Sequence, residues 1–293
     1  MNSLTCRLCS GLALSALFLL LLPLAPSLTV CALLCTVAVA GLLEFYALLD
    51  AQGIPSFRIL GLMASVFIIA ATWLSFASGT AVLAGEHELT LLLVSILAIL
   101  VRQFPQKNNG QPLATVSCTL FGILYVPFLF NYFTKLAFTW ETPDWISPLG
   151  GTGQRLLVYL VAVVKLNDIG AYMIGSRFGR HKLIPRISPG KTWEGFFGGT
   201  AFGLLASLAI HRLWGGRLGL LSFSATDAVW LGLLLPIFGT VGDLSESLLK
   251  RAAGFKDTGR LVPGMGGVLD VLDSLLFAAP ILYLYGRMLL STP

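Results

Sequence analysis

The chain has 293 residues and a formal net charge of +5, and 56% of its residues are hydrophobic whereas only 11% are charged. Soluble domains carry about 25% charged residues, so this composition excludes an ordinary soluble globular protein. It indicates a polytopic integral membrane protein. Basic loops beside an anionic lipid surface account for the positive charge, and no nucleic-acid partner is implied.

Apolar runs long enough to cross a bilayer as α-helices recur along the whole chain. We expect an all-α fold of about nine transmembrane helices, with a polar, cytoplasm-facing cavity in the C-terminal half. The first run also resembles a secretory signal peptide, but the next run follows at once, which favours an uncleaved first span. The expected spans are residues 11–27, 30–49, 58–82, 88–103, 113–135, 154–174, 195–214, 226–244 and 268–290.

The distribution of Lys and Arg predicts the orientation of the chain. With the N-terminus in the cytoplasm, most of the basic residues between the expected spans fall on the cytoplasmic side. Short cytoplasmic loops are enriched in Lys and Arg, so we expect both polar loops of the C-terminal half to face the cytoplasm. The expected location is a bacterial inner membrane, with the active site on the cytoplasmic side.

The two halves of the chain differ in their polar content. Residues 1–150 hold little chemistry and are expected to form a transmembrane scaffold, whereas residues 151–293 hold nearly all the intramembrane charge and are expected to form the catalytic domain. Glu44 lies within the second expected span. The sequence leaves open whether it is buried and functional or lies at the membrane interface. The Glu-His-Glu run at 86–88 is expected in a solvated turn rather than in a metal site.

The sixth expected span contains Lys165, Asp168 and Tyr172 at positions i, i+3 and i+7, which lie on one face of a helix. One interpretation is a buried ion pair that holds helices together. The other is that Asp168 and Tyr172 border a polar cavity. Three glycines in and after this span would let neighbouring helices approach closely; they are Gly170, Gly175 and Gly179.

The next loop contains Ser188, Gly190, Lys191 and Thr192 directly before a helix that is expected to begin near Trp193. Two prolines in this loop break regular structure. Free backbone N–H groups and the helix dipole favour anions at a helix N-terminus, so hydroxyl groups and a lysine at this position suit a phosphate. An ordinary basic loop is the alternative.

The stretch 243–274 holds five acids and four bases between apolar runs. Asp270 and Asp273 follow a Gly-rich turn, at positions i and i+3 of the helix that enters the last span. Carboxylates from two helices can share Mg²⁺, which prefers oxygen ligands and substrate phosphates. A salt-bridged interfacial loop is the alternative. The polar residues on one face of the preceding helix are Asp243, Glu246, Ser247 and Lys250.

Three segments together resemble the phosphatidate cytidylyltransferases, also called CDP-diacylglycerol synthases. The longest runs from Ser247 to Asp273 and contains SLLKR, then KD, then PG-x-GG-x-x-D-x-x-D. The other two are SPGKTWEG at 188–195 and DIGAY at 168–172. The resemblance covers about residues 165–275, and its C-terminal segment is long and specific.

The resemblance implies transfer of cytidylyl from CTP to phosphatidic acid at the lipid bilayer, giving CDP-diacylglycerol and pyrophosphate, with Mg²⁺ as cofactor; it leaves a homodimer open. It implies Mg²⁺ ligation by Asp243 and Asp270, with Glu246 and Asp273 in support. The catalytic residues it implies are Asp243, Asp270, Lys250 and Lys191, and the substrate contacts are Ser188, Thr192, Arg251, Lys256, Asp257, Asp168 and Ser247.

The chain departs from the family pattern at three positions. Met265, Val271 and Gly190 stand where the family usually has His, Arg and Lys. The first departure removes a proton carrier or phosphate donor, and each of the others removes a cation. Two alternatives therefore remain beside the cytidylyltransferase: a CTP-dependent lipid-alcohol kinase, which would release CDP, and a non-catalytic family member or transporter.

Overall fold

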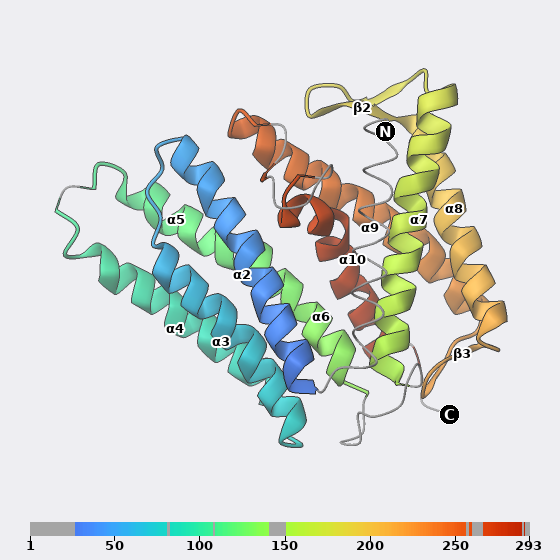
Figure 1. Ribbon diagram of the computed structural model, residues 1–293, viewed down its shortest axis with the longest axis horizontal. Coiled ribbons are helices and arrows are strands. Elements are labelled where there is room, and N and C mark those ends of the chain that lie inside the picture. The colour runs from blue at the N-terminus through green and yellow to red at the C-terminus, as the bar shows by residue number, and fades with distance from the viewer. Residues whose placement is uncertain are drawn as a thin grey trace. The chain divides into compact units, whose positions relative to one another are not determined.

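An apolar chain in hydrocarbon has no water to bind its backbone, so it satisfies its N–H and C=O groups within helices. The computed structural model describes residues 27–80, 83–107, 109–140, 151–255, 258–259, 266–288 and 290, and α-helices dominate them (Figure 1). Among those residues, eight helical spans are long and apolar enough to cross a membrane. The protein is an all-α polytopic membrane protein, as its composition predicts.

The observed spans agree with the expected ones in order and approximate position. The first expected span, 11–27, lies outside the described residues apart from Ser27. The span 112–138 contains a short π-helix around Pro127, a common site of such irregularity because proline removes one backbone donor. The helices are α2 (Ser27–Ala51), α3 (Arg58–Ala77), α4 (Ala84–Gln103), α5 (Pro112–Ile123), η2 (Leu124–Phe128), α6 (Leu129–Phe138), α7 (Thr152–Phe178), α8 (Trp193–Leu213), α9 (Ala225–Ala252) and α10 (Val268–Met288).

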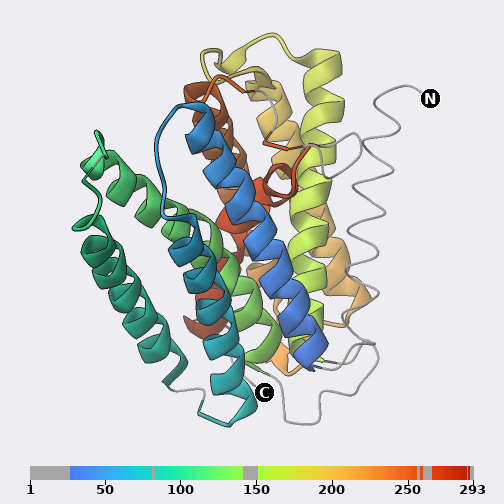
Figure 2. The same ribbon diagram turned by 60° about the vertical axis from the view of Figure 1, so that its left-hand side comes forward.

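Helices α2 to α6 form a first compact unit, which also takes in the described residues between Ala252 and Val271. Figure 2 shows α3 and α4 running side by side within it. Its core contains Ala64 and Ile68 from α3, Ile99 from α4 and Ile123 from α5. Close packing of such side chains is what associates helices in a bilayer, where no hydrophobic effect acts between them.

A buried ion pair lies inside this first unit. Lys135 Nζ is 2.5 Å from Glu88 Oε2, and the two side chains are 8% and 6% exposed. Asn131 donates to Glu88 Oε1 at 2.8 Å and to Thr72 Oγ1 at 2.9 Å. The prediction of a solvated turn at 86–88 was therefore wrong for the turn and for Glu88, because α4 begins at Ala84 and carries Glu88 into the helix bundle. Glu86 and His87 are exposed, as predicted.

Helices α7 and α8, α9 as far as Arg251 and α10 from Leu272 belong to a second unit. A chain of hydrogen bonds joins three of these helices: Tyr159 and Ser207 hydroxyls are 2.6 Å apart, and Ser207 donates to Ala228 O at 2.6 Å. Glycines bring α7 and α8 together, since a Cβ added to Gly175 would lie 3.3 Å from Gly195 Cα. The predicted close approach at the glycines of α7 is confirmed.

Two short antiparallel hairpins flank α8 and lie at its opposite ends (Figure 1). Strands β1 (Lys182–Ile184) and β2 (Ser188–Thr192) pair irregularly before α8, and β3 (Arg217–Leu218) pairs with β4 (Leu221–Ser222) after it. The sequence predicts an irregular loop at β1 and β2 because of its prolines. The structure differs, since a two-stranded hairpin has only edge strands, and edge strands tolerate proline.

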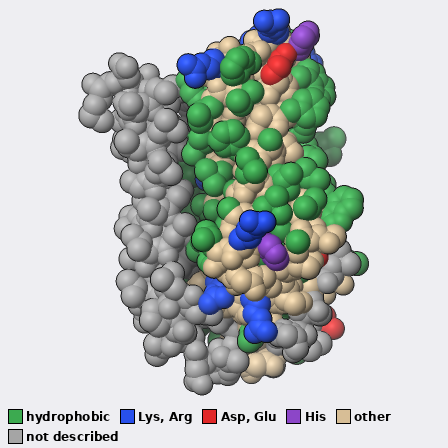
Figure 3. All heavy atoms as spheres, turned by 90° about the vertical axis from the view of Figure 1, so that its right-hand side faces the viewer, with side chains coloured by type: hydrophobic (Ala, Val, Ile, Leu, Met, Phe, Trp, Pro, Cys, Tyr) green, Lys and Arg blue, Asp and Glu red, His purple; other side chains and the backbone are tan. Residues whose placement is uncertain are grey.

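The second unit presents an apolar surface. Figure 3, which views the face that contains α8, shows hydrophobic side chains in a broad band between two zones that hold Lys, Arg and His. Phe197 and Leu205 of α8 are each 63% exposed. Soluble proteins rarely expose apolar patches of this extent, so this band is the surface that meets lipid.

The buried pair leads to a first prediction. Replacing Lys135 by Met should destabilise the protein by about 3 kcal/mol, because the charge on Glu88 then stays buried without a cation. The melting temperature in detergent, followed by tryptophan fluorescence, should fall. It should recover in the double variant Glu88→Gln/Lys135→Met, in which neither charge remains. Lys107→Met, at an exposed lysine, is the control. Equal melting temperatures for Lys135→Met and Lys107→Met would contradict the prediction.

Candidate active site

A polar face occupies the middle of α7. Lys165 Nζ lies 3.4 Å from Asp168 Oδ2, and Ser274 Oγ of α10 donates to the same oxygen at 3.4 Å. Asn167 Nδ2 donates to the other oxygen, Oδ1, at 3.5 Å. The Asp168 carboxylate therefore forms an ion pair within α7 and also connects α7 to α10 by a hydrogen bond.

The junction of β2 and α8 places a lysine and a hydroxyl at a helix N-terminus. Thr192 is the N-cap of α8, and its Oγ1 accepts from Gly195 N at 3.1 Å. Threonine is favoured there because its oxygen satisfies a donor that the helix leaves unpaired. The preceding residue, Lys191, places its Nζ 2.7 Å from Asp243 Oδ2 of α9.

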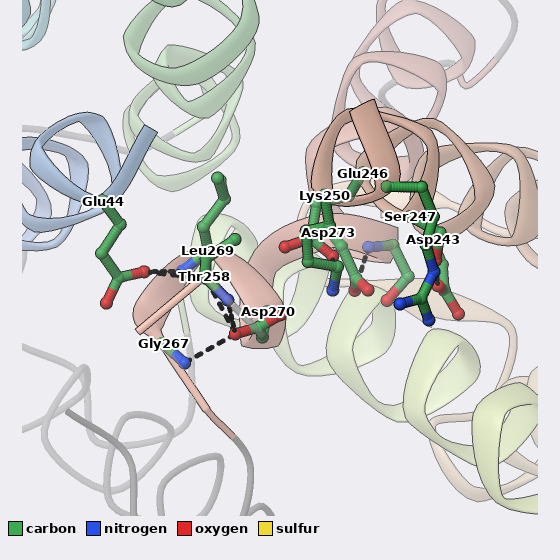
Figure 4. Close-up of polar contacts among 12 residues, drawn as sticks. Glu44, Asp243, Glu246, Ser247, Lys250, Thr258, Gly267, Leu269, Asp270 and Asp273 are labelled. Atoms are coloured by element: carbon green, nitrogen blue, oxygen red, sulfur yellow. Dashed lines mark hydrogen bonds and ion pairs between the residues drawn. The ribbon is translucent and has the colours of Figure 1, made fainter. Parts of the chain in front are cut away.

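The last turns of α9 carry four polar residues on one face, as their spacing predicts (Figure 4). Ser247 Oγ donates to Asp243 Oδ1 at 3.3 Å. Lys250 Nζ lies 2.6 Å from Glu246 Oε2, and the Glu246 side chain is completely buried. The helix end also contacts the hairpin, where Arg251 Nε donates to Ile187 O at 3.4 Å.

These elements surround one cavity of about 380 Å³ inside the second unit. Its polar wall combines α7, β2, the start of α8 and α9, so segments far apart in the sequence meet at one place. The residues that line it are Asn167, Asp168, Ala171, Tyr172, Gly175, Ser176, Leu183, Ser188, Gly190, Lys191, Thr192, Gly195, Phe196, Thr240 and Asp243.

The cavity region concentrates charge of both signs. The carboxylates of Asp168, Asp243 and Asp273 interact electrostatically with one another and with the ammonium group of Lys165. The positive charge of Lys191 also interacts with the carboxylate of Asp168. In the described part of the chain, no three His, Cys, Asp or Glu side chains converge closely enough to hold a metal ion by themselves. Oxygen donors of this kind nevertheless suit Mg²⁺, which takes only one or two carboxylates and completes its shell with water and substrate phosphate.

A second polar cluster lies in the first unit, where α10 begins (Figure 4). Glu44 of α2 accepts backbone N–H groups of Val268 at 2.9 Å and Leu269 at 2.8 Å. Asp270 Oδ2 accepts from Thr258 N at 2.9 Å, Thr258 Oγ1 at 2.8 Å and Gly267 N at 2.7 Å. Both carboxylates thus hold the start of α10 and the segment at Thr258.

The structure places the predicted site residues in several different locations. Glu246, Ser247, Lys250 and Arg251 share α9 with Asp243 but do not line the cavity, Asp270 belongs to the cluster in the first unit, and Asp273 lies one turn further along α10. Lys256 and Asp257 lie outside the described residues, as does Met265. The cavity wall contains Asp168, Ser188, Lys191, Thr192 and Asp243.

Several contacts were not predicted. Nothing in the sequence singles out Thr258, and the partner of Glu44 lies more than 200 residues away along the chain. Asn167 beside Asp168 was also missed, although an amide next to an intramembrane acid is itself a polar signal. At Gly190 no atom lies within 4 Å of an added Cβ, so the departure from a lysine leaves open space at the cavity.

The fold and site define a polytopic membrane protein with a charged cavity that suits phosphate groups. The family model for the cytidylyltransferase family matches residues 5–289. The chain therefore belongs to the cytidylyltransferase family.

Known proteins resemble the chain over part of their length. It is 36% identical to the uncharacterized protein YnbB of Escherichia coli (strain K12) over 207 residues, 68% of this chain and 64% of that protein. It is 45% identical over 138 residues to a phosphatidate cytidylyltransferase of Brucella suis biovar 1 (strain 1330), 46% of this chain and 47% of that enzyme. For a phosphatidate cytidylyltransferase of Staphylococcus aureus (strain COL) the identity is 36% over 197 residues, 67% and 68% of the two chains. The matches to the first two proteins span less than two thirds of their lengths.

The cap of α8 gives a second prediction. Thr192→Val keeps the shape of the side chain but removes the oxygen that accepts Gly195 N–H, and a lost N-cap costs about 1 kcal/mol. We expect a lower melting temperature for Thr192→Val and a nearly unchanged one for Thr192→Ser, which retains the hydroxyl. Equal melting temperatures for Thr192→Val and the wild-type protein would show that this hydroxyl does not stabilise α8.

Proposed function

We propose that this chain transfers the cytidylyl group of CTP to phosphatidic acid, giving CDP-diacylglycerol and pyrophosphate. Membership of the cytidylyltransferase family supports the chemistry, and the names of the Brucella and Staphylococcus relatives support phosphatidate as the acceptor. The observation that carries the proposal is the cavity lined by Lys191 and Thr192, directly before α8, together with Asp168 and Asp243, with Lys191 paired to Asp243.

The chemistry needs positioning rather than a strong base. A phosphate oxygen of phosphatidate is already ionised at neutral pH; it forms the new bond to the α-phosphorus of CTP while the bond to the bridging β-phosphate oxygen breaks, and pyrophosphate leaves. Holding the two anions in line provides much of the acceleration. Lys191, next to the N-terminus of α8, suits a phosphate oxygen because cation and helix dipole act together.

Lys191 Nζ and Asp243 Oδ2 form an ion pair at 2.7 Å. Binding of a triphosphate would give the lysine a more strongly charged partner and release the carboxylate of Asp243. Lys250, Arg251 and Lys256 supply further positive charge for the phosphates of CTP or lipid, and Ser188 and Thr192 supply hydroxyl donors. Asp168, Ser247 and Asp257 are proposed to contact substrate by resemblance to the family signature.

By the same resemblance, Asp243 and Asp270 would be the principal Mg²⁺ ligands, with Glu246 and Asp273 in support. Bound Mg²⁺ would neutralise charge on the α-phosphate and on the leaving pyrophosphate. The carboxylates at the cavity are oxygen donors of the kind that this ion prefers. Glu246 would act from behind the site, because its side chain is buried against Lys250.

The cavity is proposed to face the cytoplasm of a bacterial cell, where CTP is made. The hairpin and the end of α9 beside the cavity are rich in Lys and Arg, and the positive-inside rule places such segments in the cytoplasm. Phosphatidate, which is confined to the membrane, would reach the site from the inner leaflet.

The reaction is tested with the purified full chain in mixed micelles that contain phosphatidate, CTP and Mg²⁺. We expect pyrophosphate only when CTP and phosphatidate are both present, together with a CDP-lipid product. The control replaces phosphatidate with diacylglycerol, which has a hydroxyl in place of the phosphate. Release of CDP with diacylglycerol would replace the proposal with a lipid kinase, and folded protein that releases neither product would refute cytidylyl transfer.

The proposed metal ligand gives a further prediction. Asp270→Asn should lower the turnover number by about 100-fold or more, because a neutral amide replaces a charge that the transition state needs. The amide oxygen can still accept from Thr258 and Gly267, so the melting temperature should change little. Asp50→Asn, at an exposed acid that pairs with Arg58, is the control and should keep full activity. Comparable Mg²⁺-dependent activity in both variants would exclude Asp270 as a ligand.

A further inference from the structure

Glu44 is a buried acid that the proposed chemistry does not use. It lies on α2, and the residue is 7% exposed. Both carboxylate oxygens accept hydrogen bonds: Oε1 from Val268 N at 2.9 Å, and Oε2 from Leu269 N at 2.8 Å and from Thr258 Oγ1 at 3.3 Å. One side chain therefore contacts both the first turn of α10 and the segment that precedes it.

The charge of Glu44 is compensated differently from that of Glu88, another buried acid of the first unit. Glu88 pairs with Lys135 at 2.5 Å, whereas no Lys or Arg in the described part of the chain lies within ion-pair distance of Glu44. Glu44 instead lies at the N-terminus of α10, where unpaired N–H groups and the helix dipole favour a negative charge. Its partners are backbone groups, so its contacts fix the position of the backbone.

Glycines make this contact possible. A Cβ added to Gly267 would collide with the Glu44 carboxylate and with Thr258 Oγ1, and one added to Gly259 would lie 2.7 Å from Glu44 Oε1. Gly266 has a φ of 108°, a backbone conformation that residues other than glycine rarely adopt. The Gly-Gly pair before α10 thus lets α2 approach the turn closely enough for a carboxylate to reach two backbone amides.

Asp270 is coupled to Glu44 through a shared neighbour. Thr258 Oγ1 lies 2.8 Å from Asp270 Oδ2 and 3.3 Å from Glu44 Oε2. Asp270 also accepts from Gly267 N at 2.7 Å, next to the Val268 amide that Glu44 binds. Displacement of the α10 start would therefore move the Asp270 carboxylate as well (Figure 4).

We propose that Glu44 is a positioning residue: by capping the N-terminus of α10, the carboxylate from α2 holds Asp270 in the orientation that the reaction requires. This role rests on the proposed function for its consequence in catalysis, and on the hydrogen bonds alone for its effect on α10. Glu44 belongs to the N-terminal scaffold half of the chain. In this proposal, the orientation of Asp270 in the signature of the C-terminal half depends on it.

The kinetic test compares Glu44→Gln with Glu88→Gln, both at temperatures where tryptophan fluorescence shows the variants to be folded. The new amide in Glu44→Gln would keep one acceptor oxygen but turn an N–H donor toward a backbone N–H. We expect Glu44→Gln to lower the turnover number by about tenfold or more and to raise the half-saturating Mg²⁺ concentration, as changes behind metal ligands do. Glu88→Gln should lower the melting temperature without moving the Mg²⁺ dependence. An unchanged Mg²⁺ dependence in Glu44→Gln, or the same shift in both variants, would overturn the role.

A double-mutant cycle tests whether Glu44 acts through the glycine turn. Gly267→Ala should impair the wild-type protein, because its methyl group displaces the Glu44 carboxylate. The same change should have a much smaller additional effect in Glu44→Ala, where that carboxylate is absent, so the effects on turnover should be strongly non-additive. Additive effects would mean that the two residues act separately, which would overturn the proposed coupling.

Amide hydrogen exchange provides a readout that does not depend on activity. In Glu44→Gln, peptides that contain Val268 and Leu269 should exchange faster than in the wild-type protein, since their amides lose a charged acceptor; in Glu88→Gln they should not. Unchanged exchange in Glu44→Gln would overturn the positioning role whatever the enzyme does. Faster exchange in a chain whose wild-type form transfers no cytidylyl group would leave the capping role in place and refute only the proposed function.

Discussion

The structure depends on one constraint: a charge inside an apolar helix bundle needs a partner, because solvation by water is not available there. Glu88 forms an ion pair with Lys135 of another helix, and Glu246 forms one with Lys250 on the next turn of its own helix. Glu44 takes backbone amides at a helix start. The contacts of Glu88 and Glu44 join segments that lie far apart in the sequence, whereas the contact of Glu246 stays within α9.

The cavity of the second unit follows from the same constraint combined with small residues. Glycines on α7 and α8 allow backbones to approach closely, which places the β1–β2 hairpin and the capped start of α8 beside the polar face of α7. The ion pair between Lys191 and Asp243 then joins this region to α9. In the proposed function, a substrate phosphate would compete with the carboxylate of Asp243 for Lys191.

The family signature has two kinds of residues in this protein. Lys191 and Asp243 meet at the cavity, whereas Gly266, Gly267 and Asp270 build the turn that starts α10. Glycines of a signature are readily assigned to ligand binding, but Gly267 is required here for the approach of a carboxylate from α2. The departure at Gly190 differs in kind, because it leaves space at the cavity instead of altering a contact.

Hydropathy and spacing alone predicted the all-α membrane fold, the order of the spans, the start of α8 near Trp193 and the polar faces of α7 and α9. These features are local, since each follows from the composition and spacing of residues within a single helix. The tertiary structure decided which polar groups meet. Glu88 looked like a solvated residue because no local pattern reveals Lys135, which lies 47 residues away from it. Likewise, only packing of α2 against the start of α10 could give Glu44 its partners, because a contact between distant segments leaves no periodic signal in either one.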